Sequence, residues 1–200
     1  MTMGSRRHDR NGEKPEIRDG FKFHAGHVAL DLPCTLAARL KPAPRELLAH
    51  PGDLGRWLVA AEMSSAVPRV TQADLDFAKT LRESIYSLAL ARIHHAALPD
   101  EARQQLNRLA ATTAAVPQLD PLRRLQFSGK TRALLASIAR DAVILLSSEI
   151  SERIRQCEGE TCALLFLDTS RSGDRRWCSM SGCGNRAKVA DFRRRKRLGD

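Results

Sequence analysis

Four cysteines in the last quarter of the chain constrain its fold more than any other feature. Cys157 and Cys162 are separated by four residues, Cys178 and Cys183 by another four, and fifteen residues lie between the pairs. Two closely spaced pairs joined by about 15–20 residues are typical of a four-thiolate zinc site, because each pair forms a tight turn. The spacing predicts one structural zinc ion per chain, held by these four residues.

Disulfide bonds and unrelated core cysteines are the alternatives to a zinc site. Residues 1–20 are polar and mixed in charge, without the apolar stretch of a secretory signal. Because persistent disulfides are disfavoured in a reducing compartment, we interpret the four cysteines as zinc ligands. Four thiolates leave no open position for a reacting water, which argues against catalysis at the metal. The fifth cysteine, Cys34, is expected to be a small buried apolar residue.

The residues around the cysteines predict a treble-clef-like finger. Residues 164–167 have strand character, 168–174 form a polar turn, and 175–178 supply a return strand. The last cysteine opens a helix over 184–197. One face of this helix is shared by Asn185, Val189, Phe192 and the stem of Lys196. A piece of about 40 residues buries too little surface to fold alone, so the metal is expected to supply much of its folding free energy.

The region before the first cysteine is predicted to be helical. Of all residues 42% are hydrophobic and only 4% are aromatic, which favours packed helices over a β-sandwich. Thr71 and Asp74 form a capping-box pattern that starts one helix, and Asp53 is placed as the N-cap of another. Periodic apolar residues predict further helices, which span 54–63, 100–111 and, as the longest and most central, 130–156.

The chain divides into three parts on this evidence. Residues 1–20 alternate in charge, contain almost nothing apolar and are expected to be a disordered tail. Residues 21–156 form a helical domain, with one short helix within 21–44 and either short strands or a loop over 116–127. Residues 157–197 form the finger. The fold class is therefore mainly α, with a helical N-terminal domain that includes a small strand pair, followed by a four-cysteine finger.

Positive charge is concentrated in the finger. The whole chain has 33 basic and 23 acidic residues, for a net charge of +10. Between Arg171 and Arg197 there are ten Lys or Arg residues and two acids, so this segment carries +8 and the rest of the chain +2. Such a shift is typical of a domain boundary, and a basic module favours a polyanionic partner.

Several short motifs resemble a known family. The run Cys183-Gly-Asn-Arg186, preceded by Arg-Trp-Cys-Ser-Met over 176–180, is similar to the CGNR zinc-finger family. Upstream, Ala25-Gly-His-Val-Ala-Leu-Asp31 and Leu81-Arg-Glu-Ser-Ile-Tyr86 resemble the helical ABATE domain that commonly precedes that finger. The resemblance implies a bacterial, stress-linked transcription regulator whose finger binds DNA. Where the family reads Asp-aromatic-aliphatic-Asn-Thr, this chain has Asp31-Leu-Pro-Cys-Thr35.

Basic residues of the finger are candidate DNA contacts. On a helix that starts at Gly184, the side chains of Arg186, Arg193 and Arg197 form one stripe. Such a stripe can follow a phosphate backbone or enter a major groove. The full set of candidates is Arg175, Arg176, Arg186, Lys188, Arg193, Arg194 and Arg197. The alternatives to DNA are an acidic protein surface and a solvated basic face without a partner.

The helical domain offers candidate ligand-binding residues in His27, Asp31 and Arg82. His27 and Asp31, together with His24, have a spacing that allows a common pocket. Arg82 either pairs with Glu83 in solvent or points inward, where it needs a buried partner or an anionic ligand.

Other residues of the helical domain give weaker signals still. His94 and His95 lie at a helix end without a clear ligand set, and Trp57 is expected in the core. The sequence contains no nucleophile paired with a nearby His in a recognisable motif and no glycine-rich phosphate loop, which argues against an enzyme, including one that processes nucleic acid.

The expected function is that of a transcription regulator. The finger binds DNA, and the helical domain senses a small-molecule effector or holds a homodimer together. A cytoplasmic location is expected, because no apolar run reaches the ~18–20 residues that cross a bilayer. The second hypothesis is a protein-interaction module, in which the finger docks on a partner such as the transcription machinery.

Overall fold

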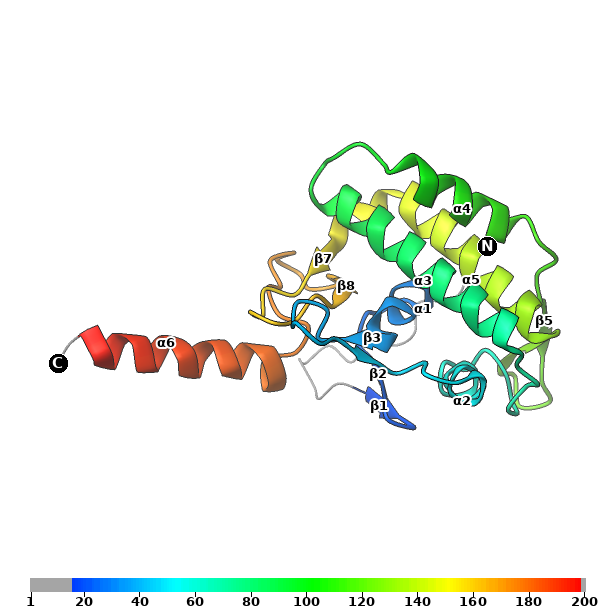
Figure 1. The fold of residues 1–200 in the computed structure, drawn as a ribbon, viewed down its shortest axis with the longest axis horizontal. Helices are drawn as coiled ribbons and strands as arrows, with labels where there is room; N and C mark the ends of the chain where they lie inside the picture. The colour runs from blue at the N-terminus through cyan, green and yellow to red at the C-terminus, as the bar shows by residue number, and fades with distance from the viewer. Residues whose placement is uncertain (1–15, 199–200) are drawn as a thin grey trace.

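The computed structural model describes residues 16–198, which form a helical body from which one long helix projects (Figure 1). The body contains α1 (Val28–Asp31), α2 (Pro51–Ala60), α3 (Gln72–Ile93), α4 (Asp100–Ala110) and α5 (Thr131–Ser147). The projecting helix is α6 (Asn185–Leu198). The predicted fold class, mainly α with a small strand pair and a C-terminal four-cysteine cluster, is confirmed.

Helices α3, α4 and α5 pack against one another and form the largest layer of the body (Figure 1). Helix α3 starts at the predicted capping box. Thr71 Oγ1 accepts from the Asp74 N–H at 3.2 Å, and the Asp74 carboxylate accepts from the Thr71 N–H at 3.0 Å. These two bonds satisfy backbone donors that lack partners at a helix start, so the local sequence alone fixes where α3 begins.

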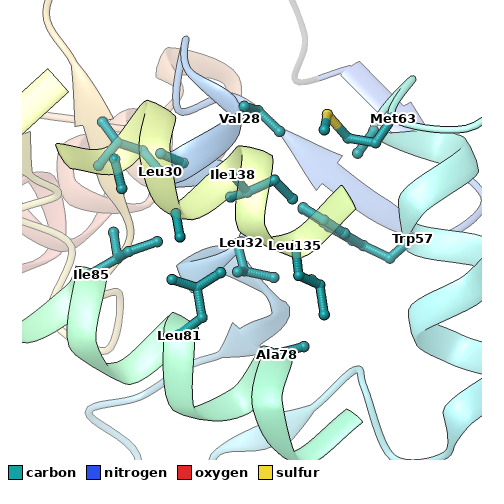
Figure 2. Close-up of a cluster of buried hydrophobic side chains, with 14 of the residues drawn as sticks. Val28, Leu30, Leu32, Trp57, Met63, Ala78, Leu81, Ile85, Leu135 and Ile138 are labelled. Atoms are coloured by element: carbon teal, nitrogen blue, oxygen red, sulfur yellow. The ribbon is translucent and has the colours of Figure 1, made fainter. Parts of the chain in front are cut away.

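The core lies between this layer and the short segment around α1. Figure 2 shows Leu30 and Leu32 of this segment gathered with Leu81 of α3 and Ile138 of α5. Trp57 of α2 is fully buried in the same core, as predicted, and its ring stacks on Phe23 with the ring centroids 6.3 Å apart. Cys34 is also buried, as predicted.

The strands of the described residues form four antiparallel pairs. They are β1 (Glu16–Arg18) with β2 (Phe21–Phe23), β3 (Leu36–Ala37) with β4 (Arg45–Glu46), β5 (Val116–Leu119) with β6 (Leu125–Ser128), and β7 (Ile154–Gln156) with β8 (Leu165–Leu167). Residues 116–127 were expected to form either short strands or a loop, and the β5–β6 hairpin shows that they form strands. Strand β1 corrects the predicted tail, because residues 16–18 are paired; the rest of that prediction, over 1–15, lies outside the described residues.

The prediction of one helix over 130–156 was wrong. Helix α5 ends at Ser147, Ser148 is extended, and a 3-10 turn η2 (Glu149–Arg153) leads into β7. The hydroxyls of Ser147 and Ser148 donate to the carbonyls of Ile144 and Leu145, which competes with continuation of the helix. As a consequence Ile150, which lies beyond the end of α5, is 45% exposed.

Two smaller predictions were also wrong. Asp53 is not an N-cap: α2 begins at Pro51, and the Asp53 carboxylate accepts from the N–H of the preceding His50 at 2.8 Å. Residues 175–178 are not a return strand, because β8 pairs with β7, upstream of Cys157. The Arg175 N–H is bound instead by the Asp168 carboxylate at 2.9 Å.

The β7–β8 pair joins the finger to the body. Ile154, Leu165 and Leu167 belong to the same buried cluster as the helices, and the Leu167 N–H donates to the Ala25 carbonyl at 2.8 Å. The base of the finger is thus packed into the helical core, and the division at 156/157 stays a prediction. Within residues 16–198, no helix is long and apolar enough to span a bilayer.

Candidate metal centre and basic helix

The four cysteines that the spacing singled out come together in space. The Sγ atoms of Cys157, Cys162, Cys178 and Cys183 all lie within 4.8 Å of one another. Cys157 and Cys162 lie in the turn between β7 and β8, and Cys178 lies after β8. Cys183 lies in a π turn, η3 (Met180–Gly184), just before α6.

The separations between sulfurs fit a zinc ion. A tetrahedron with Zn–S bonds of ~2.3 Å places its sulfurs about 3.8 Å apart. The Cys162 and Cys178 sulfurs are 4.0 Å apart, and those of Cys178 and Cys183 are 3.6 Å apart. A disulfide needs ~2.05 Å, and none of the chain's cysteines is disulfide-bonded. The cluster therefore suits one zinc ion with a closed, structural shell.

Backbone groups hold the first cysteine turn in place. The Cys157 N–H donates to the Leu164 carbonyl at 2.9 Å, and the Cys162 N–H donates to the Gly159 carbonyl at 2.8 Å. A Cβ added at Gly159 would lie 3.2 Å from the Cys183 sulfur and 3.1 Å from the Cys162 Cβ. Gly159 therefore lets the first turn approach the cluster closely.

Without a bound metal the sulfurs compete for protons. Contacts with Cys162 and Cys178 lower the pKa of Cys157 to about 2. The contact with Cys157 raises the pKa of Cys162 to about 12, and a like contact raises the pKa of Cys178 above its ordinary value. Zinc takes all four groups as thiolates, so its binding releases protons and zinc affinity falls as the pH falls.

Asp168 organises the loop between the two cysteine pairs, a role that the sequence reasoning missed. Its carboxylate accepts from the Ser170 N–H at 2.9 Å, from the Ser170 hydroxyl at 2.6 Å and from the Arg175 N–H at 2.9 Å. Burial opposes its ionisation, but these hydrogen bonds outweigh burial and lower its pKa. The Asp-x-Ser pattern of an Asx turn was the available signal.

Arg175 and Arg176, two predicted DNA contacts, are engaged within the finger. The Arg175 guanidinium lies 4.3 Å from the centre of the Phe166 ring and donates to the carbonyls of Trp177 and Cys178. Arg176 pairs with Glu158 at 2.6 Å and is exposed. Arg175 thus braces the segment that carries Cys178, which its basic character alone did not reveal.

The other predicted DNA contacts lie on α6. Arg186 donates to the Cys183 sulfur at 2.9 Å, so its guanidinium interacts with a predicted metal ligand. The remaining four are fully on the surface: Lys188, Arg193, Arg194 and Arg197. Helix α6 projects from the body (Figure 1), and these four cations are exposed along it.

The helix face that Val189 and Phe192 share, which the sequence pattern would place against the protein, is not buried. Val189 is 48% exposed and Phe192 is 63% exposed. The helix projects away from the body, so these two side chains have little protein surface to pack against (Figure 1). An amphipathic pattern indicates which face would be buried, but it does not show that a partner surface exists within the same chain.

The three candidate ligand-binding residues are distributed over two places. His27 Nδ1 lies 3.2 Å from a carboxylate oxygen of Asp141 in α5. Asp31 is buried and accepts from the Ala25 N–H at 3.1 Å. Arg82 points instead toward Glu46, with two guanidinium nitrogens at 2.7 and 2.8 Å from its carboxylate oxygens.

Arg82 therefore finds a half-buried carboxylate partner within the chain. It is only 4% exposed and also contacts Glu83 at 2.8 Å. Burial opposes the charge on Glu46, yet the hydrogen bonds from Arg82 and from the Leu48 N–H prevail and lower its pKa. A two-pronged pair of this kind satisfies the guanidinium without an external anion.

Two family models match the chain. Residues 26–149 match the ABATE family, which is described as a putative stress-induced transcription regulator. Residues 153–196 match the CGNR zinc finger. The second match covers the four sulfurs and nearly all of α6, and the first covers the helical body. A search of curated proteins finds no match.

Proposed function

The chain belongs to the ABATE family of transcription regulators and ends in a CGNR zinc finger, and on this basis we propose that it binds DNA through α6. In this proposal zinc fixes the finger, and the finger holds α6 at a defined angle to the body. The helical body regulates this binding, either by sensing a ligand or by pairing two copies of the chain.

The exposed charge of α6 carries the proposal. Residues 185–198 contain seven Arg or Lys residues and one acid, Asp191. A helix of 14 residues is about 21 Å long and fits a DNA major groove. The cations lie on several sides of the helix, so the groove floor and the phosphates on both flanks are within reach of different side chains.

Zinc would be held by Cys157, Cys162, Cys178 and Cys183 and would supply a rigid anchor rather than chemistry. The anchor acts on α6 through η3, because Cys183 lies two residues before Asn185, where the helix begins. A single finger offers little contact area, so strong specific binding favours a homodimer that presents two fingers.

A protein partner is the second candidate, and one observation favours it. Val189 and Phe192 form an exposed apolar patch on α6, among the cations. Such a patch suits a protein surface that is both acidic and apolar. Salt separates the two candidates: DNA affinity should fall with a log–log slope of about −0.9 per phosphate contacted, whereas a protein partner bound partly through apolar contacts should show a shallower slope.

The test reverses three exposed charges of α6 and leaves the metal centre intact. We expect the combined change Lys188→Glu, Arg193→Glu and Arg197→Glu to abolish DNA binding in an anisotropy titration without lowering zinc content. Arg186 is left unchanged because it contacts the Cys183 sulfur.

The matched control makes the same change in net charge on the body. Arg69, Arg108 and Lys130 are all exposed there, and their joint replacement by Glu should weaken DNA binding far less. Equal losses in both variants would show that only net charge matters, and unchanged binding in the α6 variant would favour the protein partner.

A further inference from the structure

A pocket opens between α3, α4 and α5, at the ends of α3 and α5 that lie nearest to η2. Its volume is about 450 Å³, within the range of small-molecule sites. Leu88 of α3 and Leu106 of α4 are buried in its wall, and Val143 and Leu146 of α5 are half-buried. The inner surface is thus apolar and made of side chains from three helices.

The ionisable side chains that line this pocket are all basic. Arg92, Arg103 and His95 line it, and no Asp or Glu does so among residues 16–198. Asn107 and Ser147 add hydrogen-bonding groups. Leu88 and Leu106 are buried, whereas Arg103 and Asn107 are exposed. The pocket therefore has an apolar interior and a basic opening.

Both arginines have partners that an incoming anion can replace. Arg103 pairs with Asp100 one turn earlier at 2.7 Å, and the Asp100 side chain is 79% exposed, so this pair contributes little to stability. Arg92 donates to the Ser151 hydroxyl at 3.0 Å and pairs with Glu152, whose side chain is 56% exposed.

From this arrangement we propose that the pocket binds a small amphipathic carboxylate. The apolar tail lies against Leu88, Leu106 and Val143, and the carboxylate binds at Arg92 and Arg103. A partly buried carboxylate gains stronger hydrogen bonds from the guanidinium groups than a solvated Asp or Glu does, which favours the exchange.

The site is connected to the finger through the chain itself. Ser151 and Glu152 lie in η2, which leads directly into β7 and then to Cys157. A carboxylate at Arg92 competes with Glu152 and loosens η2 from α3. This regulatory consequence rests on the proposed function, in which the body senses a ligand and the finger binds DNA.

Calorimetric titration of the zinc-loaded full chain tests the site, with octanoate as the probe and 1-octanol and octylamine as matched ligands. Octanoate should bind and octylamine should not, while 1-octanol should bind at least tenfold more weakly than octanoate. Arg92→Gln and Arg103→Gln should each weaken octanoate binding about tenfold, and Arg108→Gln, an exposed site outside the pocket, should leave it unchanged.

Glu152→Gln provides the sharpest result. It removes the competing carboxylate, so octanoate should bind more tightly, while binding of 1-octanol should not change. A site that only accommodates an apolar tail would show no such difference.

Three results would overturn the proposal: no octanoate binding, equal binding of octanoate and 1-octanol, or binding that ignores both arginines. Dimerisation through the pocket, seen as a sedimentation change that Leu98→Glu reverses, would assign this face to a second copy instead. No DNA is present in these titrations, so their failure leaves DNA binding by α6 standing, and the loss of DNA binding would leave the pocket standing.

Discussion

The helical body and the finger are stabilised by different interactions. The body buries large apolar side chains such as Trp57, Leu81 and Leu134 almost completely. The finger's own buried cluster contains Phe166 and three of the cysteines, with little else. The size of the apolar core sets how far a region depends on a metal, because a small region cannot bury enough surface to offset its conformational entropy.

The border between the two kinds of stabilisation does not coincide with the first cysteine. Strand β8 lies between the cysteine pairs, yet Leu165 and Leu167 belong to the core of the body. Only the turns, the loop and η3 lie beyond that core. We therefore expect loss of zinc to unfold the outer finger and to release α6 while β7 and β8 remain paired.

Removal of one sulfur should separate the two regions most strongly. Cys178→Ser should lose zinc, whose apparent binding free energy in small fingers is about 10–16 kcal/mol, and should unfold the outer finger. The chain's two tryptophans report on the two regions: Trp177 fluorescence should change, while Trp57, buried in the body, should not.

Cys34→Ser is the matched control for this change. Cys34 is buried in the body and donates to the Leu30 carbonyl, which a serine can also do. Zinc content measured by mass spectrometry should stay at one per chain. Full zinc occupancy in Cys178→Ser would remove the four-sulfur site.

A change at Arg82 should do the opposite and weaken only the body. Arg82→Met leaves Glu46, whose side chain is 29% exposed, without its main partner, so the loss should be smaller than the about 3–5 kcal/mol of a fully buried pair. Urea unfolding followed by helical circular dichroism measures this loss, and zinc content should not change. Arg108→Met, at an exposed position, should lie within about 0.5 kcal/mol of the original chain.

The neighbouring residues Arg175 and Arg176 should differ in how much each stabilises the finger. Arg175→Ala removes two hydrogen bonds to carbonyls beside Cys178 and should destabilise the finger by about 1–3 kcal/mol. Arg176→Ala removes an exposed pair with Glu158 and should cost less than about 1 kcal/mol. The rate of zinc transfer to a chelator ranks them, and equal rates would contradict the bracing role of Arg175.

The smallest effect is the pH dependence of the body. The pKa of Glu46 is lowered in the folded chain, so its pairing stabilises the fold above the unfolded pKa of about 4.3 and is lost as the pH falls through the folded value. Urea midpoints between about pH 5 and pH 3 should therefore fall more steeply for the original chain than for Glu46→Gln. Parallel curves would show that folding does not lower the pKa of Glu46.

Features set by short-range patterns could be predicted from the sequence. The cysteine spacing identified the cluster, because each closely spaced pair forms a short turn and the two turns then meet around one metal ion. The start of α3 was likewise predictable, since Thr71 and Asp74 cap the helix by themselves.

Features that depend on distant partners were missed. The strand partner of β8 lies before Cys157, and no local pattern distinguishes it from the segment after the loop. The role of Arg175 depends on Phe166 lying beneath it, and the exposure of Phe192 depends on the direction in which α6 leaves the finger. Each is a consequence of tertiary arrangement rather than of residue type.

We propose that the metal-dependent region binds DNA, whereas the helical body folds without the metal. An anisotropy titration of labelled duplex DNA, before and after zinc is removed by a chelator and again after zinc is restored, tests it directly. We predict that chelation abolishes binding, that the helical circular dichroism of the body largely persists, and that zinc restores binding. DNA binding that survives complete removal of zinc would contradict the claim.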